Sequence, residues 1–152
     1  MAAPADERHV SAVRHRVAAC LDAWRVCPGD QDDIGLIVGE LAANEARHGR
    51  DDMTIMVSVS PAAAHIEVVD SGGPARSRER ETDGDECGRG LDIVRCLAQS
   101  LQCHRDAAGT RVCADYRLSG VPENVKEAGT GVASGGRQAH LVETCRATTK
   151  LD

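Results

Sequence analysis

The sequence predicts an α+β protein in which helices pack on one face of a mixed, mainly antiparallel sheet, forming a two-layer sandwich. Two amphipathic helices come first, and two hairpins of alternating apolar residues follow, with a third helix between the hairpins. At 152 residues and 41% hydrophobic composition, the chain can bury one core but is too short for two ordinary domains. We therefore expect one domain over residues 6–118. Residues 119–152, rich in glycine, serine and threonine, are expected to form a flexible, largely disordered tail.

Two helices are predicted before the first strand. The first follows a candidate cap at Asp6 and ends before Pro28, and the second runs from about Gln31 to Gly49, which suits the left-handed closing position of a helix. Apolar residues recur three and four positions apart in both segments: Val10, Val13, Val17, Cys20, Leu21 and Trp24 in the first, and Ile34, Ile37, Val38 and Leu41 in the second.

Alternating patterns predict the strands. Residues 53–60 alternate apolar and mostly polar side chains, and the alternation resumes after a turn at 61–64 to reach Asp70, which predicts an antiparallel hairpin. Residues 71–89 form a long, charged, glycine-rich segment that suggests a lid. A closing hairpin is expected at 102–105 and 110–118, and a short helix is possible near 138–146 in the tail. The third helix is defined by Leu91, Val94, Leu97, Ala98 and Leu101.

Composition excludes several classes of function. The net charge of −6 and the aromatic content of 1% argue against nucleic-acid binding, which needs phosphate neutralisation or stacking platforms. The seven cysteines form no CxxC pair and are odd in number, which argues against a zinc knuckle, a redox dithiol or a closed disulfide framework. Neither an export signal nor an apolar run of about 20 residues is visible, so we expect a cytoplasmic protein without a membrane partner.

The second helix carries the first candidate site. Glu40, Asn44 and His48 are four residues apart, so they line one helix face. An amide oxygen is a hard ligand suited to magnesium, and a carboxylate can orient or deprotonate a nucleophile. Taken alone, the triplet favours an ordinary solvated polar face, which is the more common case.

Three further segments are weak signals when taken singly. Asp70 ends an apolar strand and is followed at once by Ser71, Gly72 and Gly73, where a carboxylate can accept from an exocyclic amine, although such turns are common. A glycine-flanked start to the third helix would hold phosphates on free N–H groups, but its spacing fits neither a P-loop nor a Rossmann fingerprint. The residues of this helix start are Gly88, Arg89, Gly90 and Leu91. The last of the three segments is Gly109-Thr110.

As an ordered set, these motifs resemble the GHKL (Bergerat-fold) ATPase superfamily. The matching features are an ELxxN box with HG at 40–49, DxGxP at 70–74, GRGL at 88–91 and a late GT at 109–110. Within the superfamily, the chain is most similar to the small bacterial anti-sigma-factor serine kinases. The resemblance covers roughly residues 6–118.

The resemblance implies a role for each matched residue, with ATP and Mg²⁺ as ligands. Glu40 would be the general base or the carboxylate that orients water, and Asn44 would bind magnesium. Asp70 would accept from the adenine amino group, with Gly72 against the base and Thr110 completing the adenine pocket. The remaining nucleotide contacts would come from Gly88, Arg89, Gly90 and Leu91 of the phosphate loop, together with Arg47 and His48, although a capping role for His48 is an equal alternative.

The chain departs from the family pattern in ways that bear on function. Only residues 1–5 precede the first helix, where relatives have a β-strand that some use for dimerisation, so formation of a homodimer stays open. Glu45 replaces a small residue beside the box asparagine, and it would either point to solvent or weaken nucleotide binding. Pro74 stands where many relatives have a third glycine.

The main functional hypothesis from the sequence is an anti-sigma factor with serine/threonine protein kinase activity. It would bind a sigma factor and phosphorylate an anti-anti-sigma partner with a STAS-type fold. The first alternative is an ATP-responsive binding module that regulates a partner without phosphorylating it. A second is a degenerate domain that binds no nucleotide.

Overall fold

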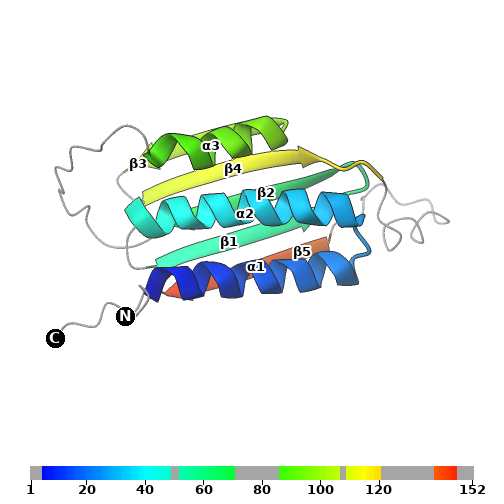
Figure 1. Ribbon diagram of the computed structural model, residues 1–152, viewed down its shortest axis with the longest axis horizontal. Helices are drawn as coiled ribbons and strands as arrows, with labels where there is room; N and C mark the ends of the chain where they lie inside the picture. Colours follow the sequence, from blue (N-terminus) through cyan, green and yellow to red (C-terminus); the bar gives the residue numbers. More distant parts are fainter. Residues whose placement is uncertain (1–4, 49–51, 71–85, 107–108, 121–138, 147–152) are drawn as a thin grey trace.

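The structure is a computed structural model that describes residues 5–48, 52–70, 86–106, 109–120 and 139–146, with side chains described at 10–45, 53–70, 89–105 and 109–120. Its described strands form one five-stranded sheet in the order β3-β4-β2-β1-β5, with every neighbouring pair antiparallel. The three helices lie on one face of this sheet (Figure 1). This arrangement confirms the predicted two-layer α+β sandwich. The elements are α1 Ala5–Ala23, α2 Pro28–His48, β1 Asp52–Val59, β2 Ala63–Asp70, α3 Glu86–Leu97, β3 Ser100–Asp106, β4 Gly109–Arg117 and β5 Ala139–Arg146.

Helix α1 is capped at its C-terminal end by Arg25 and not ended by the Pro28-Gly29 pair. Arg25 has a left-handed φ of 55°. Its N–H donates to the Asp22 carbonyl at 2.9 Å, and the next N–H, of Val26, donates to the Leu21 carbonyl at 3.0 Å. These two bonds satisfy carbonyls that the end of α1 would leave unpaired. Pro28 instead begins α2, where its missing N–H costs nothing, so α2 starts three residues before the predicted Gln31.

One core lies between the helices and the sheet. The apolar stripe of α2, the stripe of α1 and the inward residues of three strands are almost fully buried together. Alternate residues of β2 and β4 point into this core, as the alternating sequence pattern predicted. No described helix is long and apolar enough to cross a membrane.

The third helix begins earlier and ends earlier than the sequence pattern predicted. It starts at Glu86 and ends at Leu97, so Leu101, which was assigned to the helix, belongs to β3. The physical reason is that the chain enters the sheet at once: the Gln99 N–H donates to the Asp115 carbonyl at 2.7 Å. Leu101 then pairs with Ala114 and packs against the same core as part of a strand.

The C-terminal region differs most from the structure that its sequence predicted. Residues 139–146 form strand β5, so the short helix expected near 138–146 was wrong, and this segment is not a disordered tail. The strand pairs antiparallel with β1 along its whole length, with Val57 opposite Leu141. This pairing supplies backbone partners along an edge of β1 that the other described strands leave open, which is why a strand is favoured there. The sheet therefore extends beyond the predicted domain boundary at Leu118 (Figure 1).

The end of β4 is tied to the first turn of α2. The buried Asp30 carboxylate accepts the Ser119 N–H at 3.0 Å and the Ser119 hydroxyl at 3.0 Å. The Tyr116 hydroxyl lies 3.0 Å from an oxygen of Asp30 and 2.8 Å from an oxygen of Asp33. Burial, followed by these two acceptors, raises the pKa of Tyr116 well above its usual range, so the hydroxyl stays protonated and donates.

Candidate functional site

The Glu40 side chain of α2 faces the first turns of α3. A Cβ added at Gly90 would lie 2.6 Å from Oε2 of Glu40, closer than real Cβ atoms approach an oxygen. A glycine at position 90 therefore lets the carboxylate approach the α3 backbone directly. The two segments that the sequence singled out separately, at 40–49 and 88–91, are thus in contact.

Asn44 and Glu45 connect this contact to the sheet. The Asn44 side chain hydrogen-bonds the Glu45 carboxyl group. Glu45 is only 5% exposed, which excludes the first of its two predicted alternatives, that it points to solvent. The cause is its place on the helix: Glu45 follows Leu41 and Ala42 on the buried stripe of α2.

A second carboxyl group, that of Asp70, lies at the same end of the sheet. Asp70 is the last residue of β2 and is 4% exposed. Burial raises the pKa of Glu45, and the nearby Asp70 charge raises it further, while Arg105 and the Asn44 hydrogen bond act in the opposite direction. Two buried carboxyl groups therefore lie together, with one guanidinium near them.

Thr110 lies beside Asp70 in the sheet. The two residues are register partners on β2 and β4, and Thr110 is also the register partner of Arg105 on β3. Thr110 is half-buried at the start of its strand. A hydroxyl, a carboxylate and a guanidinium are therefore carried by three adjacent strands at one end of the sheet.

The GRGL segment lies inside α3 instead of opening it. Because α3 begins at Glu86, the four N–H groups without a helical partner are those of residues 86–89, which include Gly88 and Arg89. The N–H groups of Gly90 and Leu91 fall past this first turn. Leu91 packs half-buried against the core, and Arg89 is exposed. Gly90 serves the contact with Glu40, so these residues have different roles within one motif.

Three predicted site residues lie wholly or partly outside the described part of the chain. Gly72 lies in the segment 71–85, outside the described residues. Arg47 and His48 belong to the last turn of α2, and only their backbone is described. The predicted lid falls mainly in the same segment as Gly72.

The sequence had singled out most of the described residues that the fold gathers here, but it gave no role to Arg105 and did not predict the burial of Glu45. Glu45 could have been found, because it continues the i, i+3, i+4 spacing of the apolar stripe. Arg105 could not, because its approach depends on the register between β3 and β4. The contact between Glu40 and Gly90 likewise depends on how α2 packs on α3.

The donor set suits a purine nucleotide with a hard cation. The Asn44 hydrogen bond lowers the pKa of Glu45, which is the effect of an amide N–H donating to a carboxylate, and the side chain of Asn44 also carries an amide oxygen. Amide and carboxylate oxygens are the ligands that Mg²⁺ prefers in proteins. Asp70 offers a buried acceptor of the kind that recognises an exocyclic amine.

Most of the chain matches a known protein family. The family model described as histidine kinase-like ATPase domain matches residues 3–116. No curated protein matches the chain. Among solved structures, the histidine kinase domain of the blue-light activated histidine kinase from Erythrobacter litoralis is similar, with a TM-score of 0.47 and 22% sequence identity. That match covers 72% of this chain and 61% of the other chain, so the chain spans less than two thirds of that domain's length.

Proposed function

Starting from the chain's membership of the histidine kinase-like ATPase domain family, in the GHKL superfamily, we propose that it is an ATP-binding anti-sigma factor with serine/threonine protein kinase activity. Its partners would be a sigma factor, which it silences, and a STAS-type anti-anti-sigma protein, which it phosphorylates on serine. The observation that carries the proposal is the direct contact between Glu40 and the α3 backbone at Gly90, beside the α3 N–H groups.

The adenine end of ATP would bind at the ends of β2 and β4. Asp70 would accept from the adenine amino group, and the Thr110 hydroxyl would complete the hydrogen bonds to the ring. The burial of Asp70 supports this role, because a carboxylate shielded from water gains more from a specific donor than an exposed one.

The phosphate end would lie between α2 and α3. Free N–H groups in the first turn of α3, at residues 86–89, favour anions, and the exposed Arg89 can reach a phosphate. The amide oxygen of Asn44 is the residue atom that would hold Mg²⁺, which, when bound, neutralises phosphate charge. Glu40 would accept the proton of the attacking serine hydroxyl, and its half-buried carboxylate can be reached from outside the core.

A phosphotransfer assay tests the kinase activity. The full chain is incubated with labelled ATP, magnesium and candidate STAS proteins, and phosphoserine is measured on the partner. We expect transfer by the wild type and loss of transfer in Glu40→Gln, with ATP binding retained in the variant. Absence of transfer to every candidate, while ATP still binds, would sink the kinase proposal and leave the binding site standing.

One observation favours a second function, a module that binds ATP and a partner without transferring phosphate. Glu45 places an additional buried carboxyl group beside Asp70 and next to the metal-binding candidate Asn44. Calorimetry that detects ATP binding, together with ATP-dependent binding of a sigma factor and no phosphoserine, would favour this module over the kinase.

A further inference from the structure

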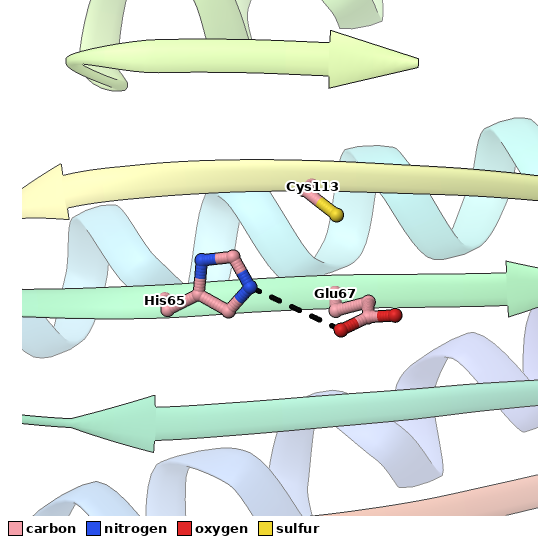
Figure 2. A group of neighbouring side chains, drawn as sticks. All are labelled: His65, Glu67 and Cys113. Carbon is pink, nitrogen blue, oxygen red and sulfur yellow. Dashed lines mark ion pairs between the residues drawn. The ribbon is translucent and has the colours of Figure 1, made fainter. Parts of the chain in front are cut away.

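The sheet face opposite the helices carries a polar cluster that the nucleotide site does not use. Alternate residues of β2 and β4 point into the core, so the residues between them point to the other face. His65 and Glu67 on β2, with Cys113 and Asp115 on β4, are half-buried residues of that face. Figure 2 shows three of these side chains in front of the strands, with the helices behind the sheet.

The fold brings three metal-ligand types together there. Glu67 and Cys113 are register partners on adjacent antiparallel strands, and His65 is two residues from Glu67 on the same face. One ligand atom from each of the three residues lies within 4.8 Å of the other two. The Nε2 atom of His65 is 3.9 Å from Oε2 of Glu67 (Figure 2).

The Asp115 carboxylate occupies one ring nitrogen of the histidine. Nδ1 of His65 lies 2.7 Å from Oδ1 of Asp115, so Nδ1–H donates to the carboxylate, and in the neutral ring Nε2 is the nitrogen with the lone pair that a metal can use. The other oxygen of Asp115 accepts the Ser100 hydroxyl at 2.6 Å, which orients the carboxylate in turn. A metal-binding imidazole commonly donates the N–H of its other ring nitrogen to a carboxylate in this way.

Glu67 is also held in its orientation by a neighbouring side chain, that of Arg111. Arg111 donates from Nε to Oε1 of Glu67 at 3.1 Å, which leaves Oε2 as the oxygen that faces His65. The side chain of Glu67 is 15% exposed and that of His65 is 42% exposed, so an ion can enter from solvent.

We propose that His65, Glu67 and Cys113 bind a divalent transition-metal ion of the zinc class, with a water molecule as the fourth ligand. The combination of imidazole, thiolate and carboxylate suits zinc or cobalt and disfavours magnesium and calcium, which take oxygen ligands. Ligand atoms in a four-coordinate zinc site are about 3.4–3.6 Å apart, given bonds of about 2.0–2.3 Å. Rotation of the three side chains therefore has to move their ligand atoms by only about 1 Å to close the site.

Binding would proceed by replacement of a proton. The Cys113 thiol loses its proton to solvent as the thiolate bonds to the ion, and no oxidation or reduction occurs. The carboxylates of Glu67 and Asp115 offset the ionic charge, whereas the Arg111 guanidinium opposes it and limits affinity. The bound ion would link β2 to β4 on the face away from the nucleotide.

Cobalt spectroscopy tests the site on the full chain, without nucleotide, so the result does not depend on the proposed function. We expect one Co²⁺ per chain, a thiolate-to-cobalt charge-transfer band and the visible bands of four-coordinate cobalt, with displacement by Zn²⁺. Cys113→Ser should abolish the charge-transfer band, while Cys96→Ser, which removes an exposed thiol on α3, should leave it intact. Asp115→Asn should weaken cobalt binding by about 10- to 100-fold without removing a ligand.

Two outcomes would overturn the proposal. One is the absence of stoichiometric binding to the wild type, which would make the cluster an ion-pair network only. The other is a charge-transfer band that persists in Cys113→Ser, provided that circular dichroism shows the variant to be folded.

Discussion

The Glu40 carboxylate lies against Gly90 so closely that position 90 has no room for a Cβ while Glu40 keeps its place. The obstructing atom is the end of a flexible side chain, so an alanine at position 90 would displace the carboxylate and leave the helices packed. Contact between these two residues therefore holds the general-base candidate next to the first turn of α3, whose N–H groups at residues 86–89 are the phosphate-binding candidates.

We expect Gly90→Ala to lower phosphotransfer activity while leaving the stability of the fold nearly unchanged. The helix gains up to about 1 kcal/mol from alanine propensity, which offsets the local displacement, so the free energy of unfolding should change little. Phosphotransfer should fall because the Glu40 carboxylate moves. The matched control is Gly35→Ala on α2, where a new Cβ meets nothing within 4 Å, and it should stabilise the fold without affecting activity. Equal activity of the two variants would contradict the role given to the contact.

Asp70→Asn should weaken ATP binding. Replacing the carboxylate acceptor by an amide costs a charge-assisted hydrogen bond, worth about 1.5–3 kcal/mol, or roughly 10- to 150-fold in affinity. Isothermal titration calorimetry measures the change. Asp92→Asn, which removes an exposed carboxylate of α3 that pairs with Arg95 at 3.0 Å, is the control and should bind ATP as the wild type does. If neither the wild type nor Asp70→Asn bound ATP measurably, the nucleotide site would be rejected.

The buried Glu45 should make stability depend on pH. Its pKa in the folded chain is raised by burial and by Asp70, so the folded state holds the proton more tightly than the unfolded state. Stability is therefore greatest below the unfolded pKa of 4.5 and is lost as the pH rises through the raised folded value.

Glu45→Gln should remove this loss, so its free energy of unfolding should exceed that of the wild type at neutral pH and approach it in acid. Urea unfolding across a pH series, followed by Trp24 fluorescence, gives the comparison. Parallel pH profiles for the two proteins would mean that Glu45 is not the titrating group.

Tyr116→Phe should destabilise the fold through Asp30. The variant keeps the ring but removes the hydroxyl, which leaves the buried Asp30 with fewer donors at a cost of about 1–3 kcal/mol. Thermal and urea unfolding measure the loss. Asp32→Asn changes an exposed carboxylate in the same turn of α2 and should have little effect. A Tyr116→Phe variant as stable as the wild type would show that Ser119 alone satisfies Asp30.

Local patterns were enough to predict most of the fold. Both early helices, the first hairpin and the closing hairpin follow from spacing, because their apolar residues repeat with the period of the element they form. The helix boundaries were less accurate, because Arg25 occupies a left-handed position where glycine is the usual signal. Strand β5 was missed because its partner β1 lies far away in the chain and no local period reveals such pairing.

For the candidate site, too, the residues that local spacing marks could be predicted and the contacts between distant elements could not. The helical spacing of Glu40 and Asn44 predicted a shared face, and the end of an alternating run located Asp70. The pairing of Glu45 with Asp70, and the cluster of His65, Glu67 and Cys113, depend on which residues the strand register and helix packing bring together. Single residues can be proposed from a sequence, whereas contacts between distant elements need the fold.

The attachment of β5 to β1 also sets the order in which the molecule can assemble. On a ribosome, β5 emerges after every other described strand, so the outer edge of β1 waits without that partner until β5 has been synthesised. Closing such a distant pair is slow, and a waiting edge can accept a strand from a second copy.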